Sequence, residues 1–279
     1  ARHINDNANA DIIEKAADEI EECTIKDGFD YEGKYFIRAY DAFSHEVGSS
    51  RCEEGKIYIE PQGFCTLARI GKEKGLGKEA VKSSLKYLLN DYGCEILYPP
   101  YSTYHVELGE ISSYPEGTKE NGSVFNHNNP WLTLALCEEG MKEEAFDLYK
   151  RNAPAFIEDK SEIHQTEPYI YSQMIAGRFN PNYGRAKNSW LTGSASWSFV
   201  ALSEGILGIV PELDGLRIKP SLSKEFKSVE ITRKFRGKTF NIHIDNTIGK
   251  ETIKVNGHIQ ESNLIRLDNN ETYDVVMTF

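Results

Sequence analysis

The sequence lacks several features that would identify a class of protein at once. No apolar run approaches the ~20 residues that a membrane-spanning helix needs. The five cysteines are odd in number and scattered through the first half, with no CxxC pair. This pattern argues against a disulfide framework or a zinc site, and it favours a reducing compartment such as the cytoplasm. Phosphate-binding P-loops, GxSxG, HExxH and nucleotide fingerprints are absent as well.

Positive charge is also in short supply. The formal net charge is −11 at pH 7, from 32 basic and 43 acidic side chains. This balance argues against nucleic acid or an anionic membrane as the main partner. Aromatic residues are abundant, with 15 Tyr, 13 Phe and 3 Trp. They suit a packed core, and their ring faces could also stack on sugars, although core packing is the more ordinary role for any one of them.

The hydrophobic pattern changes near residue 208. Apolar residues recur at helical spacing over 9–23, 62–71, 78–91, 124–139, 142–151 and 194–206. Short alternating runs separated by Gly, Asn and Asp turns follow, which predicts an all-β module. We therefore expect an α+β multidomain protein, with a helical domain over 1–208 and a C-terminal β-sandwich of the jelly-roll type over 209–279. Helix pairs joined by long loops predict an antiparallel helical toroid.

The longest polar loop ends at a helix start, which is typical of a lined cavity. Residues 109–131 read GEISSYPEGTKENGSVFNHNNPW, too rich in Gly, Pro and Asn for a helix or strand over most of their length. The candidate residues on this loop are Glu110, Tyr114, Lys119, Glu120, His127 and Asn128. His127 could donate to a phosphate or act in acid–base chemistry, or it could simply cap or pack. Lys119 and Glu120 could form a plain surface ion pair.

A second polar stretch, NSWLTGSASW over 188–197, opens the last helix. Thr192 and Gly193 stand at the helix start, where free N–H groups and the helix dipole make a natural anion site. An ordinary N-cap is the alternative. We predict that this helix start and the one after His127 face one pocket. Arg38 and Asp41 are further candidates, with a structural ion pair as the alternative.

Several long runs carry a resemblance to a known family. They are YFIRAY, CEEGKIYIEPQGF, ELGEISSYPEG, YPEGTKENGSVFNHNNPW, EPYIYSQMIAG, AKNSWLTGSASW and ILGIVPELDGLRIKPSL. In this order they resemble the C-terminal half of glycoside hydrolase family 94, the inverting disaccharide phosphorylases, and in particular its cellobiose-cleaving members. The resemblance begins near residue 27 and covers nearly the whole chain.

The resemblance implies a fold and a reaction. The family has an N-terminal β-sandwich, a helical linker, an (α/α)6 barrel and a C-terminal β-sandwich, so this chain would hold the second half of the barrel and the final sandwich. The implied reaction converts cellobiose and inorganic phosphate to α-glucose 1-phosphate and glucose, with no metal or other cofactor. Phosphate is already an anionic nucleophile, so one general acid suffices and a phosphate cradle replaces the base of an inverting hydrolase.

The resemblance also implies roles for single residues. The phosphate-binding positions of the family correspond to His127, Thr192 and Gly193. The subsite for the departing glucose would be lined by Glu110, Tyr114, Lys119 and Asn128. Gln173 would hydrogen-bond the glucose being transferred; an amide in an apolar run otherwise needs a buried partner.

One departure from the family pattern matters. The family's general acid is an Asp beside a Trp, and none of Trp131, Trp190 and Trp197 has an Asp neighbour. The chain also begins without an initiator Met. We therefore expect a C-terminal piece of a longer enzyme, inactive alone and homodimeric when complete. An isolated half-toroid would expose an apolar edge and self-associate.

Other functions stay open from the sequence. Within the family, the enzyme could prefer laminaribiose, cellodextrin or chitobiose. An inverting hydrolase on the same toroid is more distant, because it would need a base carboxylate in place of the phosphate cradle. A truncated, non-catalytic carbohydrate-binding remnant is the alternative from a different class.

Overall fold

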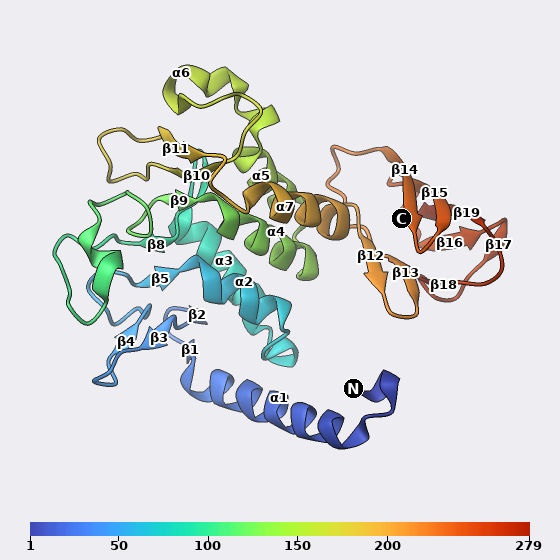
Figure 1. Cartoon of the computed structure of the whole chain (residues 1–279), viewed down its shortest axis with the longest axis horizontal. Coiled ribbons are helices and arrows are strands. Elements are labelled where there is room, and N and C mark those ends of the chain that lie inside the picture. Colours follow the sequence, from blue (N-terminus) through green and yellow to red (C-terminus); the bar gives the residue numbers. More distant parts are fainter.

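The computed structural model describes residues 1–279 and shows a helical part followed by two β-sheets (Figure 1). The α-helices are α1 (Asn7–Asp27), α2 (Ile59–Leu67), α3 (Leu76–Leu88), α4 (Asn129–Glu138), α5 (Lys142–Asn152), α6 (Ser161–His164) and α7 (Ser194–Val200). Helix α7 runs directly into a π-helix, η7 (Ala201–Ile206). None of these helices combines the length and apolar character that a membrane crossing requires.

Helix α4 is at the centre of the helical part. It packs against α2, α5 and η7, and α2 packs in turn on α3. Leu132, Ala135 and Leu136 of α4 are completely buried, because their spacing places them on one face of the helix. Burial of each leucine contributes about 1.5–3 kcal/mol, so this face stabilises the whole layer.

Short strands cap one end of the helices. They are β1 (Phe29–Asp30), β2 (Tyr35–Phe36), β3 (Ala39–Tyr40), β4 (Glu46–Val47), β5 (Ile57–Tyr58), β6 (Leu89–Asn90), β7 (Gly93–Cys94), β8 (Leu97–Tyr98), β9 (Val124–Phe125), β10 (Ser172–Ile175) and β11 (Ala186–Ser189). The last three form one sheet in the order β11-β10-β9. The connection over 92–123 is mostly irregular, as predicted, with β7, β8 and the 3-10 turn η3 (Gly109–Ser113) within it.

The predicted helix over 124–139 begins five residues late. Val124 and Phe125 form β9 and pair with Ile175 and Met174 of β10. A 3-10 turn, η4 (Asn126–Asn128), follows, and α4 begins at Asn129. The local pattern could not reveal this pairing, because its partner lies about fifty residues further along the chain.

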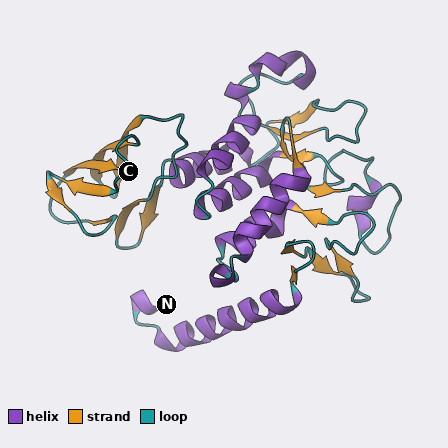
Figure 2. Cartoon of the chain, turned by 180° about the vertical axis from the view of Figure 1, so that it is seen from behind, coloured by secondary structure: helices purple, strands orange, loops and turns teal.

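Helix α1 was predicted correctly, but it is almost entirely exposed. It lies along one side of the molecule, away from the other helices for most of its length (Figures 1 and 2). Ile12, Ile13 and Ile20, here called the α1 stripe, have 66%, 62% and 63% of their surface exposed. Contact with the body includes a hydrogen bond from the Gly71 N–H to Glu21 Oε1.

Two sheets form the C-terminal part. Their strands are β12 (Ile209–Glu212), β13 (Gly215–Ile218), β14 (Ser228–Phe235), β15 (Lys238–Asp245), β16 (Thr252–Val255), β17 (His258–Ile259), β18 (Leu264–Arg266) and β19 (Thr272–Thr278). One sheet has the order β12-β13-β18 and the other β14-β15-β19-β16-β17. Every pair is antiparallel except β15 with β19.

The two sheets share one apolar core. Alternate residues of β15, Phe240, Ile242 and Ile244, are buried in it together with residues of β13. Phe146 of α5 and Ile206 of η7 belong to the same core and join the helical part to the sheets. An α-rich part followed by sheets is therefore what the chain forms; the half-barrel and the jelly-roll topology stay predictions.

Candidate functional site

Three residues predicted to bind the departing sugar lie together on the long loop. Glu110 sits in η3, and the Tyr114 hydroxyl donates a hydrogen bond to its Oε1 atom at 2.8 Å. The Lys119 ammonium lies 5.8 Å from the centre of the Tyr114 ring. The hydrogen bond to the Glu110 carboxylate raises the pKa of the Tyr114 hydroxyl. A carboxylate, a phenol and an ammonium in one neighbourhood offer both acceptors and donors to a polyhydroxylated ligand.

The side chain of Asn121 stabilises the conformation of this loop. Its buried Oδ1 accepts from the Tyr101 N–H at 2.7 Å, and its Nδ2 donates to the carbonyls of Tyr101 and Tyr114. The Lys119 N–H donates to the Met174 sulfur of β10 at 3.2 Å. The sequence analysis gave Asn121 no role, although its place before a glycine in a polar loop was a signal. These hydrogen bonds fix the backbone of the loop and thereby position its side chains.

His127 lies in η4, between β9 and α4. Its half-buried ring packs edge-on against Phe125 and Trp131, with centroid distances of 4.9 and 5.2 Å. Burial lowers the pKa of the imidazole, so the ring is neutral at pH 7, with one donor and one acceptor nitrogen. These ring contacts leave the nitrogen atoms for a ligand.

The three asparagines in and after η4 differ in their surroundings. Asn126 Nδ2 donates to the Ser172 carbonyl at 2.9 Å, and the Asn129 side chain bonds both the N–H and the carbonyl of Cys94. Asn128 is 2% exposed, and its Oδ1 has no hydrogen-bond partner. A buried unpartnered acceptor costs roughly 1–3 kcal/mol. Asn128 is therefore the one whose side chain needs a donor from a ligand or water.

The second predicted helix start lies beside the first. Helix α7 contacts η4, and the ring of Trp197 lies edge-on to that of Trp131 at 5.8 Å. Trp131 contacts the His127 ring in turn. Trp190 and Trp197 are 67% and 37% exposed. The two helix starts are thus neighbours, and the common pocket between them stays a prediction.

Thr192 precedes Gly193, the N-cap residue of α7, and its side chain closes a turn onto Ser194. Its Oγ1 accepts from the Ser194 N–H at 3.1 Å and lies 2.6 Å from the Ser194 hydroxyl. Gly193 is the residue immediately before α7 and is exposed. This bond occupies the Ser194 N–H, one of the donor groups at the start of α7. The phosphate-binding role of Thr192 and Gly193 stays a prediction.

Gln173 lies on β10, where its Oε1 accepts from the Asn188 amide at 2.8 Å. The partner that a Gln in this apolar run required is therefore supplied by the chain itself. Its Nε2 group is left as a donor. The contact with the transferred sugar is a prediction that this geometry permits.

Four of the nine buried side-chain polar atoms without hydrogen-bond partners lie on the loop, η4, α4 and α2, and the other five lie on other segments. The four are Asn128 Oδ1, Glu60 Oε2, Glu120 Oε2 and Trp131 Nε1. The plain surface ion pair that was the alternative role of Lys119 and Glu120 is not formed. The sequence analysis missed Glu60, although a charge within the apolar run IYIEP was a signal. Such a concentration of unsatisfied groups is typical of a site that binds a polar ligand.

The other two candidates are in different surroundings. The Asp41 carboxylate accepts from the N–H groups of Phe43 and His45 and lies 3.1 Å from the His45 ring. It stabilises a turn, which is the structural alternative. Arg38 instead points toward the site, with its Nε 3.8 Å from Glu60 Oε1.

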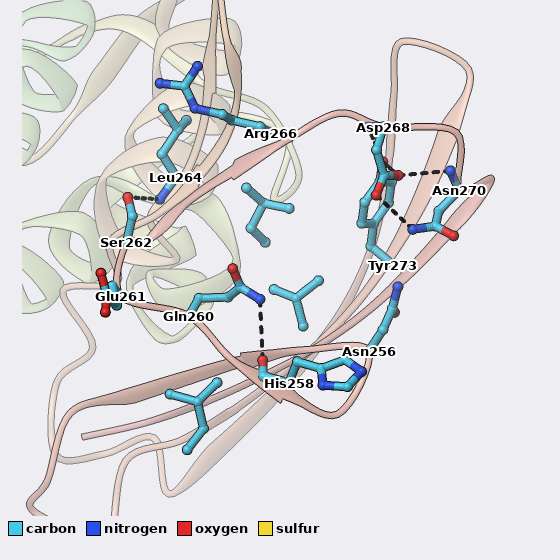
Figure 3. Close-up of a pocket in the computed structure, with 13 residues that line it drawn as sticks. Asn256, His258, Gln260, Glu261, Ser262, Leu264, Arg266, Asp268, Asn270 and Tyr273 are labelled. Carbon is cyan, nitrogen blue, oxygen red and sulfur yellow. Dashed lines mark hydrogen bonds between the residues drawn. The ribbon is translucent and has the colours of Figure 1, made fainter.

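A large open cavity of 680 Å³ lies elsewhere, in the β part (Figure 3). Its polar groups bond to one another: Asp268 with Asn270 and Tyr273, and the Gln260 amide with the His258 carbonyl. None of its residues has a buried polar atom without a partner. It therefore lacks the feature that marks the face around η4.

Comparison with known proteins links the helical part of the chain to one family. The model of the glycosyl hydrolase 94 superfamily, catalytic domain, matches residues 1–208. The N,N'-diacetylchitobiose phosphorylase of Vibrio furnissii is 31% identical over 261 residues, covering 92% of this chain and 32% of that protein. The solabiose phosphorylase of Paenibacillus borealis is 31% identical over 245 residues, covering 87% of this chain and 31% of that protein. The chain spans about a third of the length of these curated relatives.

The match extends across the helical part and includes the loop, η4 and the start of α7. It covers well over half of the chain. The chain therefore belongs to the glycosyl hydrolase 94 superfamily.

Proposed function

We propose that the protein to which this chain belongs is an inverting disaccharide phosphorylase that acts on cellobiose. Phosphate would attack the anomeric carbon of the transferred glucose from the face opposite the departing glucose. The products are α-glucose 1-phosphate and glucose, and phosphate is the cosubstrate without any other cofactor. We further propose that the whole protein is a cytoplasmic homodimer.

In this proposal, the chain supplies the phosphate cradle and the subsite for the departing sugar. His127, neutral at pH 7, donates a hydrogen bond to phosphate from one ring nitrogen. Thr192 and Gly193 add donors at the start of α7. The general acid, an Asp, would come from a part of the protein outside these residues, so the chain alone would be inactive.

The departing sugar would contact the loop. Tyr114 bonds to Glu110 there and lies beside the Lys119 ammonium, and Asn128 Oδ1 needs a donor. A sugar hydroxyl is such a donor, and it would also accept from Lys119. Gln173 would direct its free Nε2 at a hydroxyl of the transferred sugar.

The observation that carries the proposal is the convergence of separate segments on η4. Trp131 contacts both the His127 ring and Trp197 of α7, and the loop bonds through the Lys119 N–H to β10, which contacts η4. Within η4 itself, Asn128 has the unpartnered buried atom Oδ1. An inverting hydrolase would require a base carboxylate where the proposed phosphate cradle lies, and Thr192 and Gly193 argue against it. The finer choice of cellobiose rests on the resemblance of the motifs, and the relatives named above act on other disaccharides.

The test is phosphate release from α-glucose 1-phosphate and glucose. The chain extended upstream by its own coding sequence to the length of the relatives is assayed beside the bare chain and an extended His127→Ala variant. We expect release by the extended protein alone, and a loss of at least about tenfold in the variant.

Two other outcomes separate the alternatives. Release with N-acetylglucosamine, or with the donor N-acetylglucosamine 1-phosphate, but none with glucose would keep the phosphorylase and refute cellobiose. Absence of release with every donor and acceptor, in an extended protein that melts cooperatively, would refute the phosphorylase and favour the non-catalytic remnant.

A further inference from the structure

One oxygen atom of the partly buried Glu60 carboxylate lacks the hydrogen-bond donor that a buried acceptor needs. Its side chain is 21% exposed, and its Oε2 atom has no hydrogen-bond partner. Its Oε1 lies 3.8 Å from Arg38 Nε, which is an ion-pair distance but too long for a hydrogen bond. Burial of an ionised group in this state is unfavourable, and native proteins keep such groups mainly where they have a use.

The position of Glu60 places it at the candidate site. It lies in the first turn of α2, one helical turn before Phe64, so the two side chains project from the same face. The Phe64 ring lies 4.6 Å from the Trp131 ring, which in turn contacts His127. Helix α2 also contacts η4. Glu60 therefore faces the same region as the residues proposed to bind substrate.

A second unpartnered carboxylate is close by. Glu120 Oε2 is buried and has no partner, and Glu120 follows Lys119 on the loop. Burial raises the pKa of the Glu60 carboxyl; Arg38 acts in the opposite direction, and the charge of Glu120 raises that pKa further. The two carboxylates thus influence one another, with one nearby arginine that only partly offsets their charge.

The chemistry of this pair selects among ligands. A carboxylate is an acceptor, so its missing partners are donors. A phosphate dianion would be repelled by two carboxylates, whereas neutral sugar hydroxyls would supply hydrogen bonds to both. The fit is therefore to the sugar side of the site and not to the phosphate side.

We propose that Glu60 is a substrate-binding residue that determines acceptor specificity, its carboxylate accepting hydrogen bonds from hydroxyl groups of the departing sugar. This inference rests on the proposed phosphorylase function. The competing explanation is that Glu60 serves only to anchor Arg38.

The two explanations predict opposite changes in the melting temperature of the sugar-free protein. If Glu60 awaits a sugar, Glu60→Gln removes an unsatisfied buried charge, and the melting temperature of the extended protein rises by about 2 °C or more. If Glu60 anchors Arg38, the same change lowers the melting temperature and overturns the proposal. Glu73→Gln, at an exposed carboxylate without a bonded partner, is the matched control and should leave it unchanged.

Kinetics in the synthetic direction test the binding role. For Glu60→Ala, we expect the KM for the acceptor sugar to rise at least tenfold, while the KM for the sugar 1-phosphate changes less than about twofold. A series of monodeoxy acceptors identifies the contacted hydroxyl: on the analogue that lacks it, wild type and Glu60→Ala should converge. An unchanged acceptor KM, or an equal loss on every analogue, would overturn the proposal.

Failure of the proposed function gives a different result. If the wild-type extended protein turns over no sugar phosphate and shows no heat of binding with any of these sugars by calorimetry, both proposals fall. If the wild type turns over and Glu60→Ala behaves like it, only the role of Glu60 is refuted.

Discussion

The pair of Glu95 and Arg178 should be the most sensitive ion pair in the chain. Glu95 is 1% exposed, and its carboxylate accepts from Arg178 three times: from the backbone N–H at 2.7 Å, from Nε at 3.0 Å and from Nη2 at 2.8 Å. Asn90 Nδ2 is a fourth donor, at 3.1 Å. These bonds tie the turn after β10 to β7, so they also support Gln173 on β10.

Removal of the Glu95 carboxylate leaves the Asn90 amide and the Arg178 side chain without this acceptor, although solvent still reaches Arg178, whose side chain is 35% exposed. We expect Glu95→Ala to lower the free energy of unfolding by about 2–3 kcal/mol, which is less than the cost of breaking a fully buried pair. For a chain of this size, that corresponds to a fall in melting temperature of about 4–12 °C. Glu95→Gln keeps the shape and part of the hydrogen bonding, so its loss should be smaller.

Thermal and urea unfolding of the purified protein measure the effect. Asp147→Ala is the control, because the pair of Asp147 and Arg151 is half-exposed on α5 and should contribute less than about 1 kcal/mol. A loss below about 1 kcal/mol for Glu95→Ala would refute the reasoning. Equal losses at the two sites would show that burial does not control the strength of these pairs.

Three further predictions follow from other contacts. Burial acts to raise the pKa of Glu138, but hydrogen bonds from Lys219 and Lys72 outweigh it and bring that pKa to about 2. The stability that Glu138 contributes is present above the ordinary Glu pKa of about 4.3 and is lost as the pH falls toward 2. Urea midpoints of wild type and Glu138→Gln should therefore differ at pH 7 and converge near pH 2, and a constant difference would contradict this. Asn126→Ala should destabilise the protein by roughly 1–3 kcal/mol, whereas Asn128→Ala should be near neutral in melting and raise the acceptor KM; equal melting losses would refute the distinction. Replacement of the three α1 stripe isoleucines by Gln should reduce self-association of the bare chain in light scattering, and a monodisperse wild-type monomer would argue against an exposed interface there.

Much of the fold could be predicted from the sequence. Helical spacing located α1, α3 and α5, and the change to alternating runs after residue 208 located the sheets. These signals are local, because a helix or strand that buries one face repeats its apolar residues at a fixed period. The same signals wrongly predicted a helix at Val124 and Phe125. These two residues continue the apolar pattern of α4, but they form β9 and pair with β10. The local signals also could not show that α1 leaves its apolar stripe uncovered.

The candidate site, like the fold, could be predicted from the sequence only in part. The sequence by itself determined which polar residues stand at helix starts and on the long loop, and through its motifs the family. Only the tertiary structure decided which of them are free to bind: Asn126 and Asn129 are used in the fold, and Asn128 is not. It also brought Glu60 to the site. The physical reason is that hydrogen-bond satisfaction and burial depend on groups far apart in the chain, and no local pattern records those partners.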